Sequence, residues 1–361
     1  MSDQIERLEA QIRELSAQLA RIENIVTTER LANAQVRLML FNHAWLEPLP
    51  APVAAPHYLS VVCCARNEGP YLREWLEYHR LVGVEHFYFY DNGSTDDTRA
   101  LLEPYIRAGV VDYRLVEGRL MQTSAYQDAL LRARGQTYWL ALIDLDEFIV
   151  PVQHDTIPDF LQEYEHYHGV AVNWVNFDCD GHEARPLAHD ALVTANYTRT
   201  VADHDRFERD RVYKCIVRPE RVAYIMDPHI MYYRRHVLNA MPCSVTENFE
   251  PADTTSKATP RHSSAKIRIN HYYTKSRAEM EAKKERGSAN IQGYATYNSR
   301  ELYTSPCFPE DMATARDTLI IDKYLSRLQE RLRQGADAVL PGGVRRPRQA
   351  PQTGGGGDGS A

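Results

Sequence analysis

The residues best suited to chemistry follow an apolar stretch in the middle of the chain. The segment Tyr138–Ile143 ends abruptly at a cluster of acids that includes Asp144 and Asp146. A short apolar run bounded by turn signals is typical of a strand buried on both faces, and alternation along a strand would point both acids the same way. Two ionised carboxylates about 7 Å apart repel each other, and a divalent cation usually offsets that repulsion. The pattern therefore favours a metal site over a solvated acidic turn.

Two earlier apolar segments also end in polar turns. The first is followed by residues 65–69, Ala-Arg-Asn-Glu-Gly, and the second by residues 91–97, which begin with Asp91 and Asn92. Ligands of open α/β sheets bind outside the carboxyl ends of the strands, so a nucleotide is expected here. Neither a dinucleotide fingerprint nor a P-loop is present. Asp91 could accept a hydrogen bond from a pyrimidine N–H, and Asn92 could meet ribose. The same turn could also cap the next helix through Ser94 or Thr95.

The elements that would position these residues alternate between strand and helix. Short apolar segments predict strands, and amphipathic segments between them predict helices. Such alternation with short connections predicts an α/β fold, in which a parallel sheet carries helices on both faces. The predicted strands are 59–65, 87–90, 110–115 and 138–143, and the predicted helices are 70–82, 96 onward and 122–134.

After residue 151 the pattern is less regular. It predicts helices, strands and one hairpin, with polar loops over 178–210 and 240–264. The helices are 157–167, 276–286 and 311–333, the strands are 170–177 and 267–273, and the hairpin joins 212–217 to 222–226.

The two ends of the chain differ in composition from its centre. Residues 1–30 repeat apolar side chains three and four apart, which favours a coiled coil, and the chain is expected to be a homo-oligomer through this helix. A parallel dimer, a trimer, a tetramer and packing of the helix on its own domain remain open. We divide the chain into this N-terminal helix (1–46), a Pro/Ala linker (47–56), a globular domain (57–334) and a disordered tail (335–361).

The amino-acid composition and net charge of the chain exclude several classes of protein function. The chain has 361 residues, 43% of them hydrophobic and 25% charged, and a formal net charge of −7, which argues against a nucleic-acid partner. No apolar run is long enough for a transmembrane segment, and the first residues do not have the pattern of a signal peptide. Six cysteines without CxxC spacing predict reduced thiols and no zinc site. We therefore expect a cytoplasmic protein, with peripheral association at the inner membrane face as the second option.

Four blocks, in this order, carry a family resemblance. They are ARNEGPYLREWLEYHRLVGVEHFYFYDNGSTDDT, LIDLDEFIVP, KCIVRPERV and INHYYTKS. Together they resemble glycosyltransferase family 92 and its bacterial relatives among the family-2-like GT-A glycosyltransferases. The resemblance covers roughly residues 58–287, outside the N-terminal helix and the tail. It implies a GT-A fold with a mostly parallel sheet and inverting transfer of a sugar from a nucleotide donor, usually a UDP-sugar.

The resemblance also implies roles for particular residues. Asp144 and Asp146 would hold Mn²⁺ or Mg²⁺, and His271 would complete the site, with Mn²⁺ favoured by the imidazole ligand. His229 and His236 are alternative ligands. The donor contacts implied are Asp91 on the base, Glu68 near the ribose, where Asn92 is already expected from its place in the turn, and Lys214 and Lys275 on the diphosphate.

The catalytic base is where this sequence departs from the family. Inverting transfer needs a base for the acceptor hydroxyl. After Trp174 the family has a loop of small residues, whereas this chain has Phe177-Asp178-Cys179-Asp180-Gly181-His182. Trp174, Gly181 and His182 match the family, and the acids do not. Asp180 is the preferred base, Asp178 and Glu183 are the other candidates, and recognition of the acceptor or a solvated loop are the alternatives.

The sequence thus predicts a metal-dependent glycosyltransferase of the hexosyltransferase type, which acts on a glycan or glycolipid acceptor in surface polysaccharide synthesis. One alternative is a nucleotidyl- or phosphosugar transferase, although residues 65–69 are not the basic, glycine-rich loop that such an enzyme needs. The other is an inactive GT-A scaffold that acts through its coiled coil. No motif specifies the sugar, the acceptor or the linkage.

Overall fold

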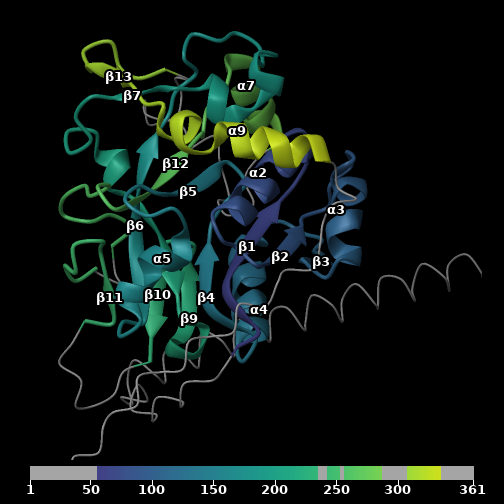
Figure 1. Cartoon of the computed structure of the whole chain (residues 1–361), viewed down its shortest axis with the longest axis vertical. Coiled ribbons are helices and arrows are strands. Elements are labelled where there is room, and N and C mark those ends of the chain that lie inside the picture. The colour runs from purple at the N-terminus through teal and green to yellow at the C-terminus, as the bar shows by residue number, and fades with distance from the viewer. Residues whose placement is uncertain (1–54, 235–241, 253–255, 287–306, 335–361) are drawn as a thin grey trace, which may run out of the picture. The chain divides into compact units, whose positions relative to one another are not determined.

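The computed structural model describes residues 55–234, 242–252, 256–286 and 307–334 (Figure 1). The predicted coiled coil, most of the linker, the tail and His236 lie outside these residues. No helix among those described is both long enough and apolar enough to cross a membrane.

Within the described residues, nine strands form one sheet, in the order β3-β2-β1-β4-β8-β6-β12-β5 with β11 beside β6. Strands β1 to β4 are parallel, whereas β8 is antiparallel to both β4 and β6, and β5 is antiparallel to β12. The predicted α/β class with a mostly parallel sheet is confirmed. The strands are β1 (His57–Ala65), β2 (His86–Asp91), β3 (Val111–Leu115), β4 (Thr137–Leu142), β5 (Glu147–Pro151), β6 (Gly169–Asn176), β8 (Tyr213–Val217), β11 (Ser244–Val245) and β12 (Ile267–His271).

Helices cover both faces of the sheet, and buried side chains fill both interfaces. Alternation along β1 sends Val61 and Cys63 to one cluster of buried side chains and Val62 and Cys64 to the other. The first cluster includes α2, α3, α5 and α9, and the second includes α4. The helices are α2 (Gly69–Leu81), α3 (Thr98–Arg107), α4 (Gln122–Ala133), α5 (Ile157–Leu161), α6 (Val193–Asn196), α7 (Arg277–Arg286) and α9 (Leu319–Gln334).

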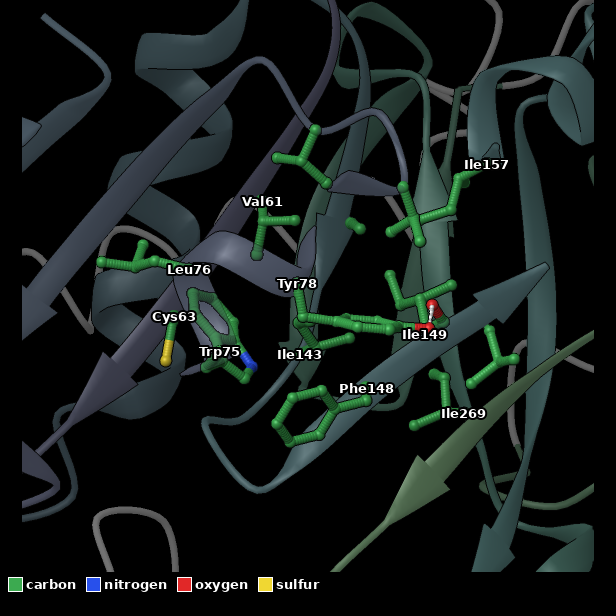
Figure 2. Packing of buried hydrophobic residues seen from close by; sticks show 14 of the residues in the cluster. Val61, Cys63, Trp75, Leu76, Tyr78, Ile143, Phe148, Ile149, Ile157 and Ile269 are labelled. Carbon is green, nitrogen blue, oxygen red and sulfur yellow. Dashed lines mark hydrogen bonds between the residues drawn. The ribbon is translucent and has the colours of Figure 1, made fainter. Parts of the chain in front are cut away.

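Helix α2 fixes the position of β5 (Figure 2). Trp75 Nε1 donates a hydrogen bond to the carbonyl of Glu147 at 2.9 Å. The Tyr78 hydroxyl donates to the carbonyl of Ile149 at 3.1 Å. His79 bridges the same elements, since its ring lies 2.8 Å from the Trp75 carbonyl and accepts from the Ile149 N–H at 3.3 Å. These buried contacts hold the start of β5 in place, and β5 begins directly after the predicted metal acids.

Three sequence predictions need correction. The segments 212–217 and 222–226 do not form a hairpin, because β8 pairs with β4 and β6, while β9 (Val222–Asp227) pairs with β10 (Ile230–Tyr233). The last helix begins at Leu319 rather than near 311, since β13 (Thr314–Arg316) first pairs with β7 (Arg199–Val201). The helix predicted at 157–167 ends at Leu161 and continues as a 3₁₀ turn.

Candidate active site

The two acids of the predicted metal site lie in a tight turn between β4 and β5. Strand β4 ends at Leu142 and β5 begins at Glu147, so Asp144 and Asp146 are not on a strand as predicted. The turn is closed by the Asp144 N–H, which donates to Glu147 Oε2 at 3.0 Å, and by the Glu147 N–H, which donates to the Asp144 carbonyl at 3.1 Å. The two carboxylates therefore have different neighbours instead of sharing one face.

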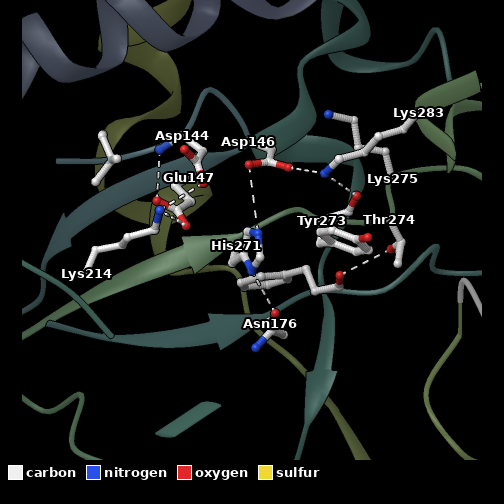
Figure 3. Close-up of polar contacts among 12 residues, drawn as sticks. Asp144, Asp146, Glu147, Asn176, Lys214, His271, Tyr273, Thr274, Lys275 and Lys283 are labelled. Carbon is white, nitrogen blue, oxygen red and sulfur yellow. Dashed lines mark hydrogen bonds and ion pairs between the residues drawn. The ribbon is translucent and has the colours of Figure 1, made fainter. Parts of the chain in front are cut away.

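Asp144 is held from two elements. On α4, Gln122 and Tyr126 both donate to Asp144 Oδ1, the tyrosine at 2.9 Å. On β8, Lys214 Nζ donates to Asp144 Oδ2 at 2.9 Å (Figure 3). The predicted diphosphate contact Lys214 is thus engaged with a predicted metal ligand.

Lys214 is fully buried and also faces Glu147. Its ammonium lies 3.7 Å from Glu147 Oε1, a buried oxygen with no hydrogen-bond partner among the described residues. Burial lowers the pKa of Lys214, but Asp144 and Glu147 outweigh that effect and hold it above its ordinary value. Burial raises the pKa of the Glu147 carboxyl well above its ordinary value. The ammonium therefore stays charged and balances the acids around it.

Asp146 lies between a lysine and a histidine (Figure 3). Lys283 Nζ on α7 contacts Asp146 Oδ2 at 2.5 Å, and His271 Nε2 lies 3.8 Å from Asp146 Oδ1. Burial raises the pKa of Asp146, but the charge of Lys283 foremost outweighs it and lowers the pKa below its ordinary range. Asp146 is therefore an ionised carboxylate.

Strand register brings His271 to the acids. His271 is the last residue of β12, where it pairs with Glu147 of β5 on one side and Asn176 of β6 on the other. His271 and Asp146 are more than a hundred residues apart in the sequence. The antiparallel pairing of β5 with β12 brings them close together in space. The predicted trio of Asp144, Asp146 and His271 is thus gathered at one end of these strands.

A chain of buried hydrogen bonds orients the His271 ring. The Asn176 side-chain N–H donates to Asp210 Oδ1 at 2.7 Å, so the Asn176 oxygen faces His271 Nδ1 at 2.9 Å. Nδ1 must then carry the proton, which leaves the lone pair of Nε2 directed at Asp146. Burial lowers the pKa of His271 well below its ordinary value, so the ring is neutral. A neutral imidazole with an oriented lone pair is the form that binds metals.

These residues fit a divalent cation in their chemistry. Two carboxylates and one imidazole nitrogen are donors that Mn²⁺ accepts, and Glu147 Oε1, which faces Lys214 without a hydrogen bond, lies on the same turn. Among the described residues, however, no group of three His, Cys, Asp or Glu side chains is arranged closely enough to hold an ion. The ammonium of Lys283 occupies the side of Asp146 that faces α7, so an ion would compete with it for that carboxylate.

The predicted nucleotide contacts lie at the exits of β1 and β2. Asp91 is buried and accepts from the Ser94 N–H at 2.7 Å and from the Tyr113 hydroxyl at 2.9 Å. The Asn92 side chain donates to the carbonyls of Val116 and Gly118. Asp91 thus shapes the turn after β2, and Asn92 anchors the loop after β3.

The turns after β1 and β2 are bound together. Ser94 Oγ accepts from the Asn67 N–H at 3.0 Å, and the Thr95 N–H donates to Asn67 Oδ1 at 2.7 Å. Neither Ser94 nor Thr95 caps α3, because its N-terminal cap is Asp97 and no side chain completes the cap. The expected capping role is therefore wrong, and these residues connect the two strand exits instead.

Glu68 and Lys275 are brought together from distant parts of the chain. Lys275 Nζ lies 3.9 Å from Glu68 Oε2 and 4.1 Å from the centre of the Tyr71 ring. Both charged residues are buried. Lys275 follows β12 by four residues, so the strand that delivers His271 also places this second lysine.

Each of the three acids in the loop after β6 forms an ion pair with an arginine. Arg199 binds both oxygens of Asp178, with Nε–Oδ1 at 2.8 Å and Nη2–Oδ2 at 2.7 Å. Asp180 Oδ2 accepts from Arg316 and from the Thr198 hydroxyl at 3.2 Å. Glu183 is exposed and contacts Arg277 at 3.0 Å. Asp180 Oδ2 is already engaged by Arg316 and Thr198, so the role of Asp180 as a base stays a prediction that needs its own test.

Four residues of this arrangement were missed or ranked low by sequence reasoning. Lys283 sits in a helix of mixed charge, and Asn176, Asp210 and Gln122 have no local signal that marks them.

The alternative ligand His229 turns its ring to the Tyr213 carbonyl at 2.7 Å, and burial lowers its pKa to about 4.

Comparison with known sequences identifies relatives. The sequence model described as Glycosyltransferase family 92 matches residues 60–275. A glycosyltransferase family 92 protein of Ricinus communis is 38% identical over 94 residues, which are 26% of this chain and 17% of the relative. One from Oryza sativa subsp. japonica is 30% identical over 166 residues, 45% of this chain and 27% of the relative. A galactan beta-1,4-galactosyltransferase of Arabidopsis thaliana is 31% identical over 103 residues, 26% of this chain and 21% of the relative.

The matched segments span less than a third of each of these relatives. Among solved structures, S. aureus TarS 1-349 in complex with UDP-GlcNAc is similar over 45% of this chain and 45% of its own. Its sequence identity is 17% and its TM-score is 0.31.

Proposed function

The chain belongs to glycosyltransferase family 92, and we propose that it transfers a sugar from a UDP-sugar donor to a glycan acceptor with the help of a divalent cation. Mn²⁺ is the favoured ion and Mg²⁺ the alternative. The transfer inverts the configuration at the anomeric carbon.

One observation carries the proposal. Asp146 and His271 come from separate parts of the chain, and their facing atoms lie 3.8 Å apart with the imidazole lone pair directed at the carboxylate. The buried Asn176 and Asp210 hold the ring in that tautomer. A hydrogen-bonded partner on the far ring nitrogen is the arrangement that usually orients a metal-binding histidine.

The cation would be held by Asp144, Asp146 and His271. When bound, such an ion neutralises the negative charge that develops on a leaving diphosphate. Lys214 lies between Asp144 and Glu147 and places a positive charge next to both carboxyl groups.

Cationic side chains support the same binding mode. Lys283 and Lys275 contact Asp146 and Glu68, and both can exchange a carboxylate for a phosphate oxygen when a donor binds. The uridine would lie at the exits of β1 and β2, against Asp91 and Asn92. Backbone and side-chain hydrogen bonds already fix these turns, so the entropic cost of ordering them when the donor binds would be small.

The acceptor is proposed to be a polysaccharide and the sugar a hexose. The support is the relative named as a galactan beta-1,4-galactosyltransferase, which makes galactose the first sugar to test. Asp180 is the proposed base for the acceptor hydroxyl, and it would have to leave Arg316 to take that proton.

The direct test is release of UDP from a panel of UDP-sugars with Mn²⁺, compared between the wild type and Asp146→Asn. We expect the variant to lose at least about 100-fold in rate while its circular dichroism is unchanged, because several kcal/mol of charge stabilisation would be lost. Asp155→Asn is the matched control, since that carboxylate is 84% exposed. A near wild-type rate in Asp146→Asn would refute the proposed site.

A further inference from the structure

Two cysteines that are far apart in the sequence meet in the fold. Cys179, in the loop after β6, and Cys307, in the segment before β13, have their sulfur atoms 2.7 Å apart. All six cysteines of the chain are free thiols. The position of this pair has no part in the proposed donor site, so it calls for a separate explanation.

Contacts that flank Cys179 and follow Cys307 hold the two segments together. The Phe308 N–H donates to Asp178 Oδ2 at 3.0 Å, so the residues next to each cysteine are bonded to each other. Further along, Arg316 binds Asp180 and β13 pairs with β7. The two sulfurs therefore face each other because hydrogen bonds join the residues on either side of Cys179 to the segment that follows Cys307.

The two thiols have different surroundings, which suits them to different steps of one reaction. Cys307 is partly exposed, and Arg277 Nη2 donates to its sulfur at 3.4 Å. A guanidinium beside an accessible sulfur is typical of reactive cysteines. Cys179 is fully buried behind Cys307, so a dissolved oxidant reaches Cys307 first and Cys179 meets only the Cys307 sulfur. An accessible attacking thiol next to a buried resolving thiol is the arrangement of redox-sensitive cysteine pairs.

We propose that Cys179 and Cys307 form a reversible disulfide by exchange with a small-molecule disulfide such as glutathione disulfide. The Cys307 thiolate attacks one sulfur of the oxidant, which forms a mixed disulfide and releases one glutathione thiolate. Cys179 then attacks the Cys307 sulfur, its proton passes to the departing glutathione thiolate, and the second glutathione leaves as a thiol; the first glutathione thiolate takes up the proton that Cys307 lost. The protein loses two thiol hydrogens, and one disulfide is reduced to two thiols.

The bond would tie the loop that holds Asp180 to the segment that holds Arg316. It would close a ring across 128 residues of sequence, which restricts the unfolded chain strongly. Oxidation would therefore stabilise the fold and fix the position of the loop. This inference does not rest on the proposed function, because it requires only the fold.

The experiment counts thiols after incubation with glutathione disulfide and removal of the reagent. In denaturant, the wild type should fall from six reactive thiols to four, and digestion without reductant should give a linked peptide pair that contains Cys179 and Cys307. The melting temperature should rise by several degrees and return after treatment with dithiothreitol.

Cys307→Ser is the informative variant, because position 307 is partly exposed and the substitution should not prevent folding. After incubation with glutathione disulfide, this variant should neither lose two thiols nor gain stability. Cys64→Ser is the control and should form the same linked peptides. Six remaining thiols, a linkage to another cysteine, or a stable glutathione adduct on Cys307 with Cys179 still free would each overturn the proposal.

Discussion

The Nδ1 atom of His271 donates a hydrogen bond to the side-chain oxygen of Asn176 at 2.9 Å. The opposite end of the Asn176 amide donates to Asp210, which is fully buried, so the amide cannot turn around without losing both contacts. His204 in turn contacts the other oxygen of Asp210 at 2.6 Å. One line of hydrogen bonds therefore runs from a partly exposed histidine to the proposed metal ligand.

Replacing Asn176 should weaken metal binding without removing a ligand. In Asn176→Ala the His271 ring loses the acceptor that fixes its tautomer, and we expect affinity for Mn²⁺ to fall about 10- to 100-fold. Titration calorimetry, or the free Mn²⁺ signal in electron paramagnetic resonance, measures this.

The matched control is Asn173→Ala, three residues earlier on the same strand. Asn173 is equally buried and donates to the Arg211 carbonyl and to Thr259, so its loss should cost stability but leave Mn²⁺ affinity unchanged. If both variants bind Mn²⁺ as the wild type does, Asn176 does not position a metal ligand.

Lys283 and a cation should compete for Asp146. In Lys283→Ala the carboxylate loses a contact at 2.5 Å, and affinity for Mn²⁺ in the absence of nucleotide should rise about tenfold, since about 1 kcal/mol or more of charge repulsion disappears. Lys284→Ala is the control on the same helix, because Lys284 contacts Glu281. Weaker Mn²⁺ binding in Lys283→Ala than in Lys284→Ala would contradict this reading.

The role of Asp180 can be separated from that of its neighbours. If it is the base, Asp180→Asn should lower the transfer rate by about 100- to 10,000-fold and leave donor binding intact. Glu183→Gln, on the same loop but exposed, should have little effect. Equal rates in the two variants would assign the base to another residue.

Acid should destabilise the fold through buried His79. Burial lowers the pKa of His79 to about 3 in the folded chain, against about 6.5 when unfolded. Between these two pH values only the unfolded chain binds a proton on this histidine. The contribution of His79 to the free energy of unfolding is therefore fully present above pH 6.5 and decreases as the pH falls.

The slope from His79 is about 1.4 kcal/mol per pH unit. Urea unfolding at pH 7, 6, 5 and 4 should show a shallower decline for His79→Gln than for the wild type, whereas the exposed His189→Gln should match the wild type. An unchanged slope in His79→Gln would show that another group controls acid unfolding.

Local pattern was enough to predict where several residues of the candidate site lie along the chain. The acids Asp144 and Asp146 follow a strand in the sequence, and the strand-helix alternation from β1 to β4 could be predicted because each element has its own apolar period. The resemblance to a family pointed to His271. What the sequence did not reveal was the turn geometry after Leu142, which gives the two carboxylates different lysine partners.

Long-range pairing accounts for what was missed. Strand β8 inserts antiparallel between β4 and β6, which delivers Lys214 to Asp144, and no local signal distinguishes that placement from a hairpin with β9. Lys283 lies in a helix with alternating charges, and the sequence of that helix does not distinguish a lysine that contacts Asp146 from one that is exposed to solvent. Partner choice between strands depends on the whole sheet, and one strand's sequence does not encode it.

The most direct measurement of the central claim is a thermal melt with UDP, GDP and CDP, each with and without Mn²⁺. A ligand at one hundred times its dissociation constant stabilises the folded state by about 2.7 kcal/mol, which raises the melting temperature by several degrees. We predict that UDP stabilises the wild type only with Mn²⁺ and does not stabilise Asp146→Asn. Absence of a shift with any nucleotide and Mn²⁺, or an equal shift without the ion, would contradict a metal-dependent UDP-sugar site at Asp146 and His271.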